Sequence, residues 1–467
     1  MKEQQVSRVL FFLGPALLLI ILALPLPLNL VQKQLAAIMT LVMCWWLNPL
    51  MPLAATGLIG VSLATAFGVS DFARALEGFS NPVIFLFMGG FFLAEALKAN
   101  QLDEWLARKF LSLPFVQGNP KRLFLGIVLL SVMFSGILSN TATAAMFIPI
   151  ALSLFDHLKI SKEHPSSALI LMVAWASTIG GVSTPIGSTP NVIGLSLLQK
   201  THGINVSFFE WMLKATPVMI VAILGMLIVF RKELRALSTS QNIQGLEVSP
   251  MTSAQRRLTV MLVATIMLWL TPGVLQLVLG LDHPYTMVAM RRIPEGLVAI
   301  GMSSLLFLIP GNPKKTLLEW HEAARIDWGT LLLFGSGIAL GQMMFDTGLA
   351  KFIGDLLPFN EMPFPLALLI LVTGTLFFTE IASNTATANL LIPVILSTAP
   401  FTSYPFVSVM CVAMSANMAF MLPVGTPPNA IIFGSGLVKL EWMIKKGFWL
   451  NITCALSIWL LALLMTL

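Results

Sequence analysis

A three-residue polar motif occurs twice in the sequence, each time inside a long apolar stretch. The two copies are Ser139-Asn140-Thr141 and Ser383-Asn384-Thr385. Hydroxyl and amide groups are costly to bury in an apolar environment unless they find partners there. An asparagine side chain can offer its oxygen to a cation while its NH2 group donates to a carboxylate, and threonine adds a hydroxyl donor. The motifs therefore predict a site that holds small cations and an anion side by side.

A second motif, rich in glycine and proline, also occurs twice. Its copies are Gly187–Asn191 (Gly-Ser-Thr-Pro-Asn) and Gly425–Asn429 (Gly-Thr-Pro-Pro-Asn). Glycine permits unusual backbone angles and proline removes an N–H donor, so each copy predicts a helix break that leaves carbonyl oxygens free for a hard cation. Each break then starts a new half-helix. Its first N–H groups, and the hydroxyl of Ser188 or Thr426, can face an anion.

These motifs belong to an internal duplication of the chain. Residues 134–149 match residues 378–393, and residues 184–191 match residues 422–429, with offsets of 244 and 238 positions. Small polar residues in membrane helices commonly serve close packing and interhelical hydrogen bonds, which can explain a single cluster. Packing alone gives no reason for both halves to carry the asparagine and the proline at corresponding places. We therefore interpret the four clusters as one duplicated binding site.

The composition indicates that these motifs lie in a membrane. The chain has 467 residues, of which 57% are hydrophobic and 10% are charged, and its mean hydropathy is +0.88. A water-soluble globule cannot hide that much apolar surface. Residues 9–32 carry no charge, and about 20 such residues cross the hydrocarbon core as a helix. Because further apolar stretches follow, a signal peptide fits this first stretch poorly.

Three stretches are too long for one simple helix and are interrupted by polar or Gly/Pro clusters. Residues 123–155, 165–199 and 381–438 contain no Asp, Glu, Lys or Arg. Irregular backbone at membrane depth is tolerated only where protein or a water-filled cavity surrounds it, so this pattern predicts re-entrant hairpins and broken helices. The predicted fold class is an all-α polytopic membrane protein.

The most polar segment divides the chain into two repeats, each with one hairpin and one broken helix. The expected domains are an N-terminal transmembrane helix over 1–34, repeat 1 over 35–230, a cytoplasmic linker over 231–257 and repeat 2 over 258–467. Basic residues gather on the predicted cytoplasmic side, among them Arg231, Lys232, Lys445 and Lys446. Five crossings in each half after the first helix would make about eleven transmembrane helices and would invert the second repeat, a topology known from secondary transporters.

None of the four motifs contains lysine or arginine. A doubly charged anion at the centre of the bilayer needs compensating positive charge, and each helix dipole offers only about half a charge. Bound monovalent cations are the remaining source, which gives a physical reason for cotransport with sodium, and such coupling is reciprocal. The sequence therefore predicts a carrier. A channel is less favoured, because nothing suggests a filter ring and duplicated broken helices suit alternating access.

Other ionisable residues have simpler explanations. Glu95 and Glu380 could titrate in a proton-coupled cycle, but neither is duplicated and an acid beside an anion site repels its ligand, so structural roles are favoured. The five histidines lie in or near the polar connections. Three isolated cysteines in apolar runs suit packing, without a disulfide or zinc site. The net charge of +6, with no basic tract carrying interleaved aromatics, predicts no nucleic-acid binding.

At these paired motifs the chain resembles the divalent anion/sodium symporter family, which includes sodium-coupled dicarboxylate and citrate transporters. The resemblance runs from residue 35 to residue 467. It implies a homodimer in the plasma membrane, which in a bacterium is the inner membrane. It also implies eleven transmembrane helices, two re-entrant hairpins, and a scaffold and a transport domain that work by an elevator motion. The activity it implies is sodium-coupled symport of C4-dicarboxylates such as succinate, malate and fumarate.

The resemblance further implies which residues bind. Its first sodium ion would lie among Ser135, Ser139, Asn140 and the carbonyl of Gly187. Its second sodium ion would lie among Thr379, Ala382, Asn384 and the carbonyl of Gly425. The dicarboxylate would contact Asn140, Thr141, Ser188, Asn384, Thr385, Thr426 and Pro427. Ser188-Thr189 stands where the second half has Thr-Pro, so the first-half contacts depart from the family pattern.

Several other functions fit parts of this sequence. A member of the same superfamily could carry citrate or sulfate, or could exchange dicarboxylates without net sodium flux. A membrane-embedded hydrolase with Ser139 or Ser383 as nucleophile would need a base nearby, and the histidines lie in or near the connecting segments. We therefore expect a transporter and no enzymatic activity.

Overall fold

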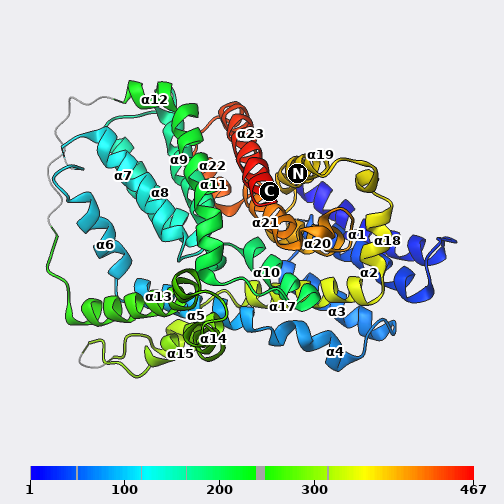
Figure 1. Cartoon of the computed structure of the whole chain (residues 1–467). Coiled ribbons are helices and arrows are strands. Elements are labelled where there is room, and N and C mark those ends of the chain that lie inside the picture. Colours follow the sequence, from blue (N-terminus) through cyan, green and yellow to red (C-terminus); the bar gives the residue numbers. More distant parts are fainter. Residues whose placement is uncertain are drawn as a thin grey trace.

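The described part of the protein is built of helices. The computed structural model describes residues 2–48, 51–116, 118–164, 166–237, 248–312 and 315–466. Within these ranges there are twenty-three α-helices, and the sole β contact is an isolated bridge between Pro310 and Thr316. Figure 1 shows the helices packed without any sheet. The predicted all-α class is confirmed.

Five of the described helices are long and apolar enough to cross a membrane singly. They are α5 (Pro82–Ala99), α11 (Phe208–Val229), α13 (Ser253–Leu279), α17 (Trp328–Asp346) and α23 (Leu440–Leu464). Eight shorter apolar helices of 10–17 residues accompany them. Short helices placed end to end reach the depth that one long helix spans, which is how a broken helix crosses a bilayer.

The chain begins with a group of helices that pack in order, α1 on α2 and α2 on α3. Pro25 and Pro27 interrupt the first apolar stretch, and Asn29 then caps a new helix in a capping box with Gln32, so α2 starts inside the segment 1–34 expected to be one helix. The elements of this group are α1 (Lys2–Ala23), α2 (Leu30–Trp46), α3 (Leu53–Ala66), α4 (Phe72–Leu76) and the 3-10 helix η1 (Glu77–Ser80).

The first half continues through a helical hairpin and a broken helix. The hairpin is α7 (Pro120–Ser135) with α8 (Asn140–His157), and the broken helix is α9 (Ile170–Val182), η3 (Pro185–Gly187) and α10 (Thr189–His202). The remaining elements of this half are α6 (Leu102–Leu111), η2 (Ser167–Leu169) and α12 (Arg231–Ala236).

The second half repeats this order. Its hairpin is α19 (Phe364–Thr379) with α20 (Asn384–Leu396), and its broken helix is α21 (Pro405–Asn417) with α22 (Pro427–Gly434). The remaining elements are α14 (Pro284–Arg292), α15 (Glu295–Leu305), α16 (Trp320–Ala323), α18 (Leu349–Asp355), η4 (Pro358–Glu361) and η5 (Phe401–Ser403).

The two halves interlock at their broken helices. In the first half, α10 packs against α20 and α21, while in the second half α22 packs against α8 and α9. Other helices also pack across the halves: α5 of the first half packs on α15 of the second, and α17 of the second half packs on α3 of the first. Each half therefore completes the other, and the duplicated motifs are brought to a shared centre.

The predicted linker 231–257 is partly helical. Its first residues form α12, residues 238–247 lie outside the described residues, and α13 begins at Ser253. Thr252 and Gln255 form a capping box at that start, which satisfies two N–H groups of the first turn. The second half thus enters its first helix five positions before the predicted boundary at residue 258.

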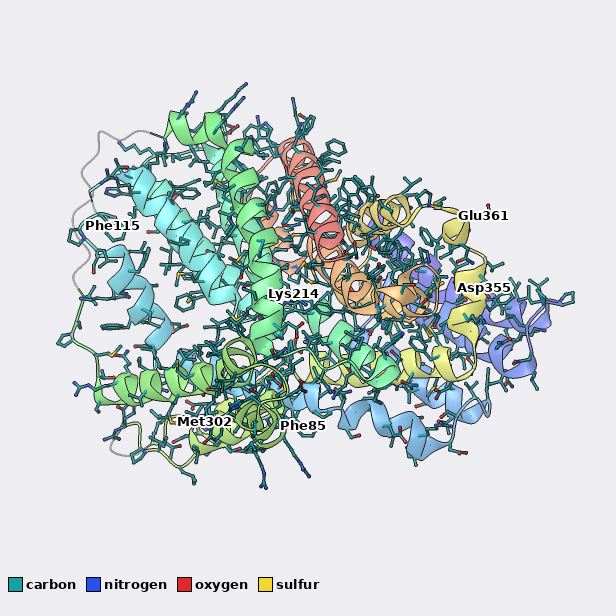
Figure 2. All side chains as sticks on the ribbon, viewed as in Figure 1. Phe85, Phe115, Lys214, Met302, Asp355 and Glu361 are labelled. Carbon is teal, nitrogen blue, oxygen red and sulfur yellow. The ribbon has the colours of Figure 1, made fainter. Side chains whose placement is uncertain are left out.

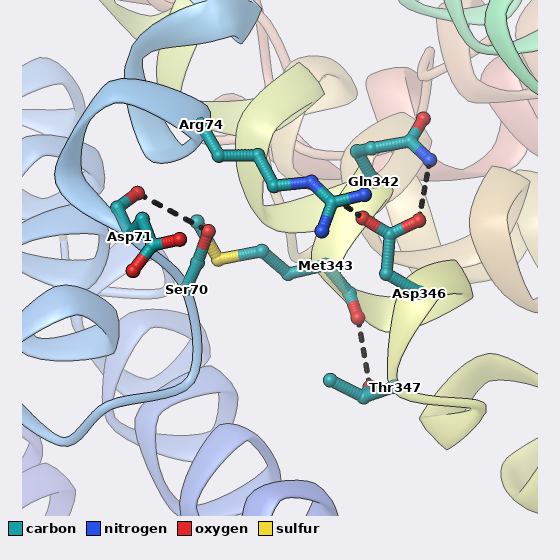
Figure 3. Close-up of polar contacts among 7 residues, drawn as sticks. All are labelled: Ser70, Asp71, Arg74, Gln342, Met343, Asp346 and Thr347. Carbon is teal, nitrogen blue, oxygen red and sulfur yellow. Dashed lines mark hydrogen bonds and ion pairs between the residues drawn. The ribbon is translucent and has the colours of Figure 1, made fainter.

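A polar contact ties the short helix α4 to the end of α17. Arg74 lies 3.9 Å from the Asp346 carboxylate, and Gln342 Nε2 donates to that carboxylate at 2.9 Å (Figure 3). The two charged side chains are 66% and 36% exposed. An ion pair this open to solvent contributes little stability, so apolar packing of α17 on α3 and η1 carries this junction.

The interior is filled by apolar side chains, while charged groups such as Asp355 and Glu361 stand at the edge of the molecule (Figure 2). The largest fully buried side chains include Trp175, Trp211 and Trp269. Cys44, Cys411 and Cys454 are buried and free, in agreement with the packing role predicted for them.

Candidate functional site

Each of the four sequence motifs forms the beginning of a helix. Helix α8 starts at Asn140, α20 at Asn384, α10 at Thr189 and α22 at Pro427. The first N–H groups of a helix have no partner within it and carry a partial positive charge. Four helix N-termini therefore present donors to the region where the two halves interlock.

The serine of each Ser-Asn-Thr motif is a helix N-cap. Ser139 Oγ accepts a hydrogen bond from Ala142 N at 3.2 Å, and Ser383 Oγ accepts one from Ala386 N at 3.1 Å. Serine is favoured at this position because its hydroxyl satisfies an N–H of the first turn. The cap fixes the hairpin tip so that the next residue, the asparagine, leads the helix.

The asparagine of the first motif faces a cluster of oxygens. The oxygen position of the Asn140 amide lies 2.7 Å from Ser135 Oγ, 3.1 Å from Ser177 O and 3.2 Å from Gly187 O. If the NH2 group occupies that position, its two hydrogens can be donated to two of these three oxygens at a time. If the amide oxygen occupies it, four oxygens converge, and oxygen atoms are the ligands that hard cations prefer.

Two glycines make this close approach possible. A Cβ atom on Gly181 would lie 2.1 Å from Asn140 Oδ1 and 2.8 Å from Gly187 O. A Cβ atom on Gly187 would lie 2.6 Å from Gly181 O and 2.9 Å from Ser135 O. Side chains at these positions would fill the space between the oxygens, so the cluster depends on their absence.

The second motif forms a matching cluster. Thr379 Oγ1 lies 2.9 Å from Asn384 Oδ1 and 2.7 Å from Ala416 O. A threonine hydroxyl has one hydrogen and can donate to only one of these acceptors at a time. Three oxygens with a single proton among them form an electron-rich cluster that a cation would satisfy. Ser135 and Thr379 occupy corresponding positions, 244 residues apart, as do the two asparagines.

The asparagines that end the Gly/Pro motifs hold both helix breaks open in the same way. Asn191 Nδ2 donates to Gly181 O at 3.0 Å and to Thr184 O at 2.8 Å. Asn429 Nδ2 donates to Ala419 O at 2.9 Å and to Leu422 O at 3.0 Å. Each bond in the second half lies 238 residues after its counterpart. These side chains replace the helical hydrogen bonds lost at the breaks.

Direct contacts join the motifs of the two halves. Thr189 Oγ1 and Thr385 Oγ1 are 2.7 Å apart, and Ser188 Oγ donates to Asn417 Oδ1. Asn417 Nδ2 in turn donates to Asn191 Oδ1 at 3.0 Å. The hairpin of one half and the break of the other are therefore held within hydrogen-bonding distance.

The predicted substrate residues differ in their access to solvent. Thr385, Thr426 and Ser188 are buried, whereas Thr141 and Pro427 are exposed. The two asparagines, Asn140 and Asn384, are half-buried. The site is therefore closed where Thr189 meets Thr385 and open at the N-terminal ends of α8 and α22.

Glu380 joins the second hairpin to the second break. Its carboxylate accepts hydrogen bonds of 2.8–3.1 Å from the backbone N–H groups of Phe420, Met421 and Leu422. Asn451 Nδ2 also donates to it, at 2.6 Å. In the first half Gly136 stands at this position, and its carbonyl accepts from Thr184 Oγ1 at 2.5 Å. Both halves thus tie hairpin to break, with different chemistry. Glu95 is half-buried on α5, and its structural role stays a prediction.

Sequence reasoning missed three contributors to these clusters. The carbonyls of Ser177 and Ala416 have no signal in the sequence, because any residue carries one. Asn417 is not duplicated, but an amide within a charge-free stretch of 58 residues, 381–438, is a usable signal. Ala382, by contrast, is buried at the second hairpin tip without a side chain that can bind, so its predicted role rests on its backbone. Ligand binding by the predicted residues stays a prediction.

The described residues contain no group of three or more His, Cys, Asp or Glu side chains that could hold a metal ion. The donors present are neutral hydroxyl, amide and carbonyl oxygens.

Comparisons with known proteins agree with this arrangement. A family model described as the sodium:sulfate symporter transmembrane region matches residues 5–466. The chain is 33% identical over 464 residues to a protein named sodium-dependent dicarboxylate transporter SdcS from Staphylococcus saprophyticus, covering 94% of this chain and 88% of that protein. It is also 33% identical over 471 residues to SdcS of Staphylococcus aureus strain USA300, covering 96% of this chain and 88% of that protein.

Two solved structures share the fold. The YdaH transporter of Alcanivorax borkumensis has a TM-score of 0.53 at 15% identity and covers 86% of this chain and 89% of its own. MtrF of Neisseria gonorrhoeae has a TM-score of 0.52 at 14% identity and covers 95% of this chain and 96% of its own. The membrane transporter fold and the location in the plasma membrane, both predicted from the sequence, are therefore confirmed. The chain belongs to the sodium:sulfate symporter family of transporters, the divalent anion/sodium symporters, in which sodium-dependent dicarboxylate transporters are found.

Proposed function

We propose that this protein carries C4-dicarboxylates such as succinate, malate and fumarate across the plasma membrane by symport with sodium ions. The observation that carries the proposal is the pair of oxygen clusters around Asn140 and Asn384, each set beside a helix N-terminus. A cation in the oxygen cluster and an anion at the helix terminus would then be neighbours. The names of the relatives, sodium-dependent dicarboxylate transporters, support the same pairing.

In the first half, the sodium ion would bind Ser135 Oγ, Ser177 O, Gly187 O and the amide oxygen of Asn140, with Ser139 fixing the hairpin tip. With its NH2 group turned toward the cluster, Asn140 would donate to two of the three other oxygens. Entry of the ion would turn the amide, so that its oxygen joins the cluster and its NH2 group points away from it. The NH2 group could then donate to the substrate, which would make anion binding depend on the cation.

In the second half, the ion would bind Thr379 Oγ1, Asn384 Oδ1 and Ala416 O, close to Ala382 and to the carbonyl of Gly425. A Cβ atom on Gly425 would lie 3.3 Å from Glu380 O and 3.4 Å from Glu380 Oε2, so Gly425, whose carbonyl is a proposed ligand, lies near a carboxylate. The negative charge would favour a cation there. We therefore infer that the second cluster holds its ion more tightly than the first.

The dicarboxylate would lie between the two clusters. Its two carboxylates would accept from the hydroxyls of Thr141, Ser188, Thr385 and Thr426, from the amides of Asn140 and Asn384, and from the N–H groups at the helix N-termini, with Pro427 lining the space. No motif residue is positively charged. Two sodium ions would balance the two charges of the substrate, which lowers the cost of bringing it to the centre of the bilayer.

We further propose that the hairpins and broken helices, together with α11 and α23, move as one transport domain. These helices pack on one another across the halves, whereas α2, α3, α5, α15 and α17 form a second set of mutual contacts, in which α5 packs on α15 and α3 packs on α2 and α17. The second set would be the scaffold and would carry the homodimer interface that the family resemblance implies. An elevator motion would then slide α10 and α20 along α17, against which both pack.

Uptake by proteoliposomes tests the proposed symport. Protein reconstituted in liposomes should accumulate labelled succinate when sodium is outside and should lose that accumulation when choline replaces sodium. Asn140→Ala and Asn384→Ala should each lower uptake at least tenfold, because a bond to a charged group contributes about 1.5–3 kcal/mol. Asn119→Ala, which removes the α7 N-cap away from the clusters, is the matched control and should leave sodium dependence unchanged. Accumulation without sodium would reject the mechanism.

The same assay separates the alternatives. Exchange would appear as uptake that requires dicarboxylate inside the liposome and ignores the sodium gradient. Sulfate is the second candidate substrate, because the chain matches the model of the sodium:sulfate symporter transmembrane region. Unlabelled sulfate or citrate that displaces labelled succinate at equal concentration would identify a transporter of broader or different specificity.

A further inference from the structure

A groove separate from the candidate site runs between α11 and α23, which pack against each other. Its volume is about 690 Å³, within the range of small-molecule sites. From α11 it is lined by Val221, Leu224, Gly225 and Ile228, which share one helix face because they are spaced by three or four residues. From α23 it is lined by Trp442, Lys445, Lys446, Trp449 and Thr453, which share one face for the same reason.

The floor of the groove is a close helix contact and its walls are apolar. A Cβ atom on Gly225 would lie 2.6 Å from Thr453 Cγ2, so the glycine lets the two helices touch at this depth. Leu224, Ile228 and Trp449 are 53%, 63% and 58% exposed. Between Lys445 and Thr453 the groove extends along α23 by roughly 12 Å, at 1.5 Å per residue. That length is close to one leaflet of the hydrocarbon core.

The rim of the groove is basic. Lys446 is neutralised, since its Nζ lies 2.7 Å from the Glu233 carboxylate and 4.6 Å from the centre of the Phe230 ring. Arg231, Lys232 and Lys445 also line the groove, are exposed, and pair with no acid among the described residues. Three unpaired cations at the end of an apolar groove are complementary to a negatively charged headgroup with an acyl chain below it. The two tryptophans suit the boundary between the two regions.

We propose that this groove binds one anionic phospholipid, with its phosphate among Arg231, Lys232 and Lys445 and one acyl chain against Leu224, Ile228 and Trp449. These cations lie on the side predicted to face the cytoplasm, where anionic lipids concentrate, and basic pockets between transmembrane helices bind such headgroups. Because α11 and α23 belong to the proposed transport domain, the bound lipid would move together with that domain.

Native mass spectrometry of the full-length, delipidated protein tests this proposal. The protein is titrated with dioleoyl phosphatidylglycerol and, separately, with dioleoyl phosphatidylcholine. We expect the first phosphatidylglycerol to bind roughly 100-fold more tightly, since each basic residue near an anionic surface contributes about fivefold. Replacing Arg231, Lys232 and Lys445 together by Gln should lower phosphatidylglycerol affinity to the phosphatidylcholine level. Millimolar glycerol 3-phosphate should not displace the lipid, because it lacks the chain that the groove holds.

Two further variants distinguish the loss of a specific lipid site from a change in the net charge of the protein or a failure to fold. The control replaces Arg122, Lys159 and Lys162, basic residues outside the groove, by Gln and should keep the preference for phosphatidylglycerol. Leu224→Trp fills the apolar wall without touching a charge and should weaken both lipids. Equal affinity for the two lipids in the unaltered protein, equal loss in the control, or displacement by glycerol 3-phosphate would overturn the proposal. None of these readouts depends on transport.

Discussion

At the residue scale, the two halves solve one problem with different side chains. Each hairpin tip must be fixed to the helix break beside it. The first half uses the Thr184 hydroxyl and the carbonyl of Gly136, while the second uses the Glu380 carboxylate and three backbone N–H groups. A buried carboxylate with four donors is satisfied without a proton. This geometry favours the structural role predicted for Glu380 over a place in a proton-coupled cycle.

Replacing Glu380 distinguishes these two roles. Glu380→Gln keeps one oxygen but turns an NH2 group toward backbone N–H donors, so at least one buried donor loses its partner. We expect the free energy of unfolding to fall by about 1–3 kcal/mol. Thermal denaturation in detergent, followed by tryptophan fluorescence, measures the loss. An unchanged melting temperature together with uptake that no longer varies with pH would instead point to proton coupling.

At the element scale, close packing of the helix breaks decides where carbonyl oxygens gather. The carbonyl of Ser177 on α9 and that of Gly187 after the break reach Asn140 because Gly181 has no side chain. Asn191 on α10 then keeps the break open by donating to the carbonyl of Gly181, near the end of α9, and to that of Thr184, within the break. The oxygen cluster is therefore a property of how α9, η3 and α8 pack together.

A glycine pair tests this dependence on packing. Gly181→Ala would place a Cβ atom 2.1 Å from Asn140 Oδ1, so the amide must shift out of the cluster. We expect at least a tenfold rise in the sodium concentration that half-saturates succinate uptake, because the amide contact to the cation is lost. Gly374→Ala on α19 is the matched control, since no atom other than those of its chain neighbours and its own helix backbone lies within 4 Å of its Cβ position. The control should keep sodium affinity. Equal sodium affinity in the two variants would show that Gly181 does not shape the cluster.

At the scale of the whole molecule, the duplication explains why one site needs both halves. Helix α10 lies among the helices of the second half and α22 among those of the first. A substrate held between them touches both repeats at once. The proposed scaffold and transport domain cut across the repeats, because each repeat supplies helices to both.

Paired cross-links test the proposed elevator motion. The native cysteines are first replaced by serine, and Gly341→Cys on α17 is then combined with Leu197→Cys on α10. A Cβ atom at position 341 would lie 3.2 Å from Leu197 Cδ2, so the two new cysteines would be neighbours. Mercury cross-linking there should stop succinate uptake, because one partner moves and the other does not. The control pair, Gly194→Cys with Val409→Cys, joins α10 to α21 inside the transport domain and should leave uptake intact. Uptake that survives the first cross-link would exclude sliding at α17.

The sequence by itself determined the membrane setting, the duplication and the four motifs. These follow from local chemistry, because apolar runs, N-cap serines, and glycine with proline act on their own neighbours wherever the chain folds. The start of α2 at Leu30 was missed. Its capping box lies inside a long apolar stretch, and the length of that stretch favoured a single helix over residues 1–34.

The tertiary structure alone decided which atoms meet. Carbonyls of Ser177 and Ala416, the amide of Asn417 and the donors around Glu380 enter the site through contacts between segments far apart in sequence. The unpaired cations of the α11–α23 groove likewise became visible only when two helix faces were brought together. A backbone carbonyl has no residue type to reveal it, and its position depends on packing that no local pattern encodes.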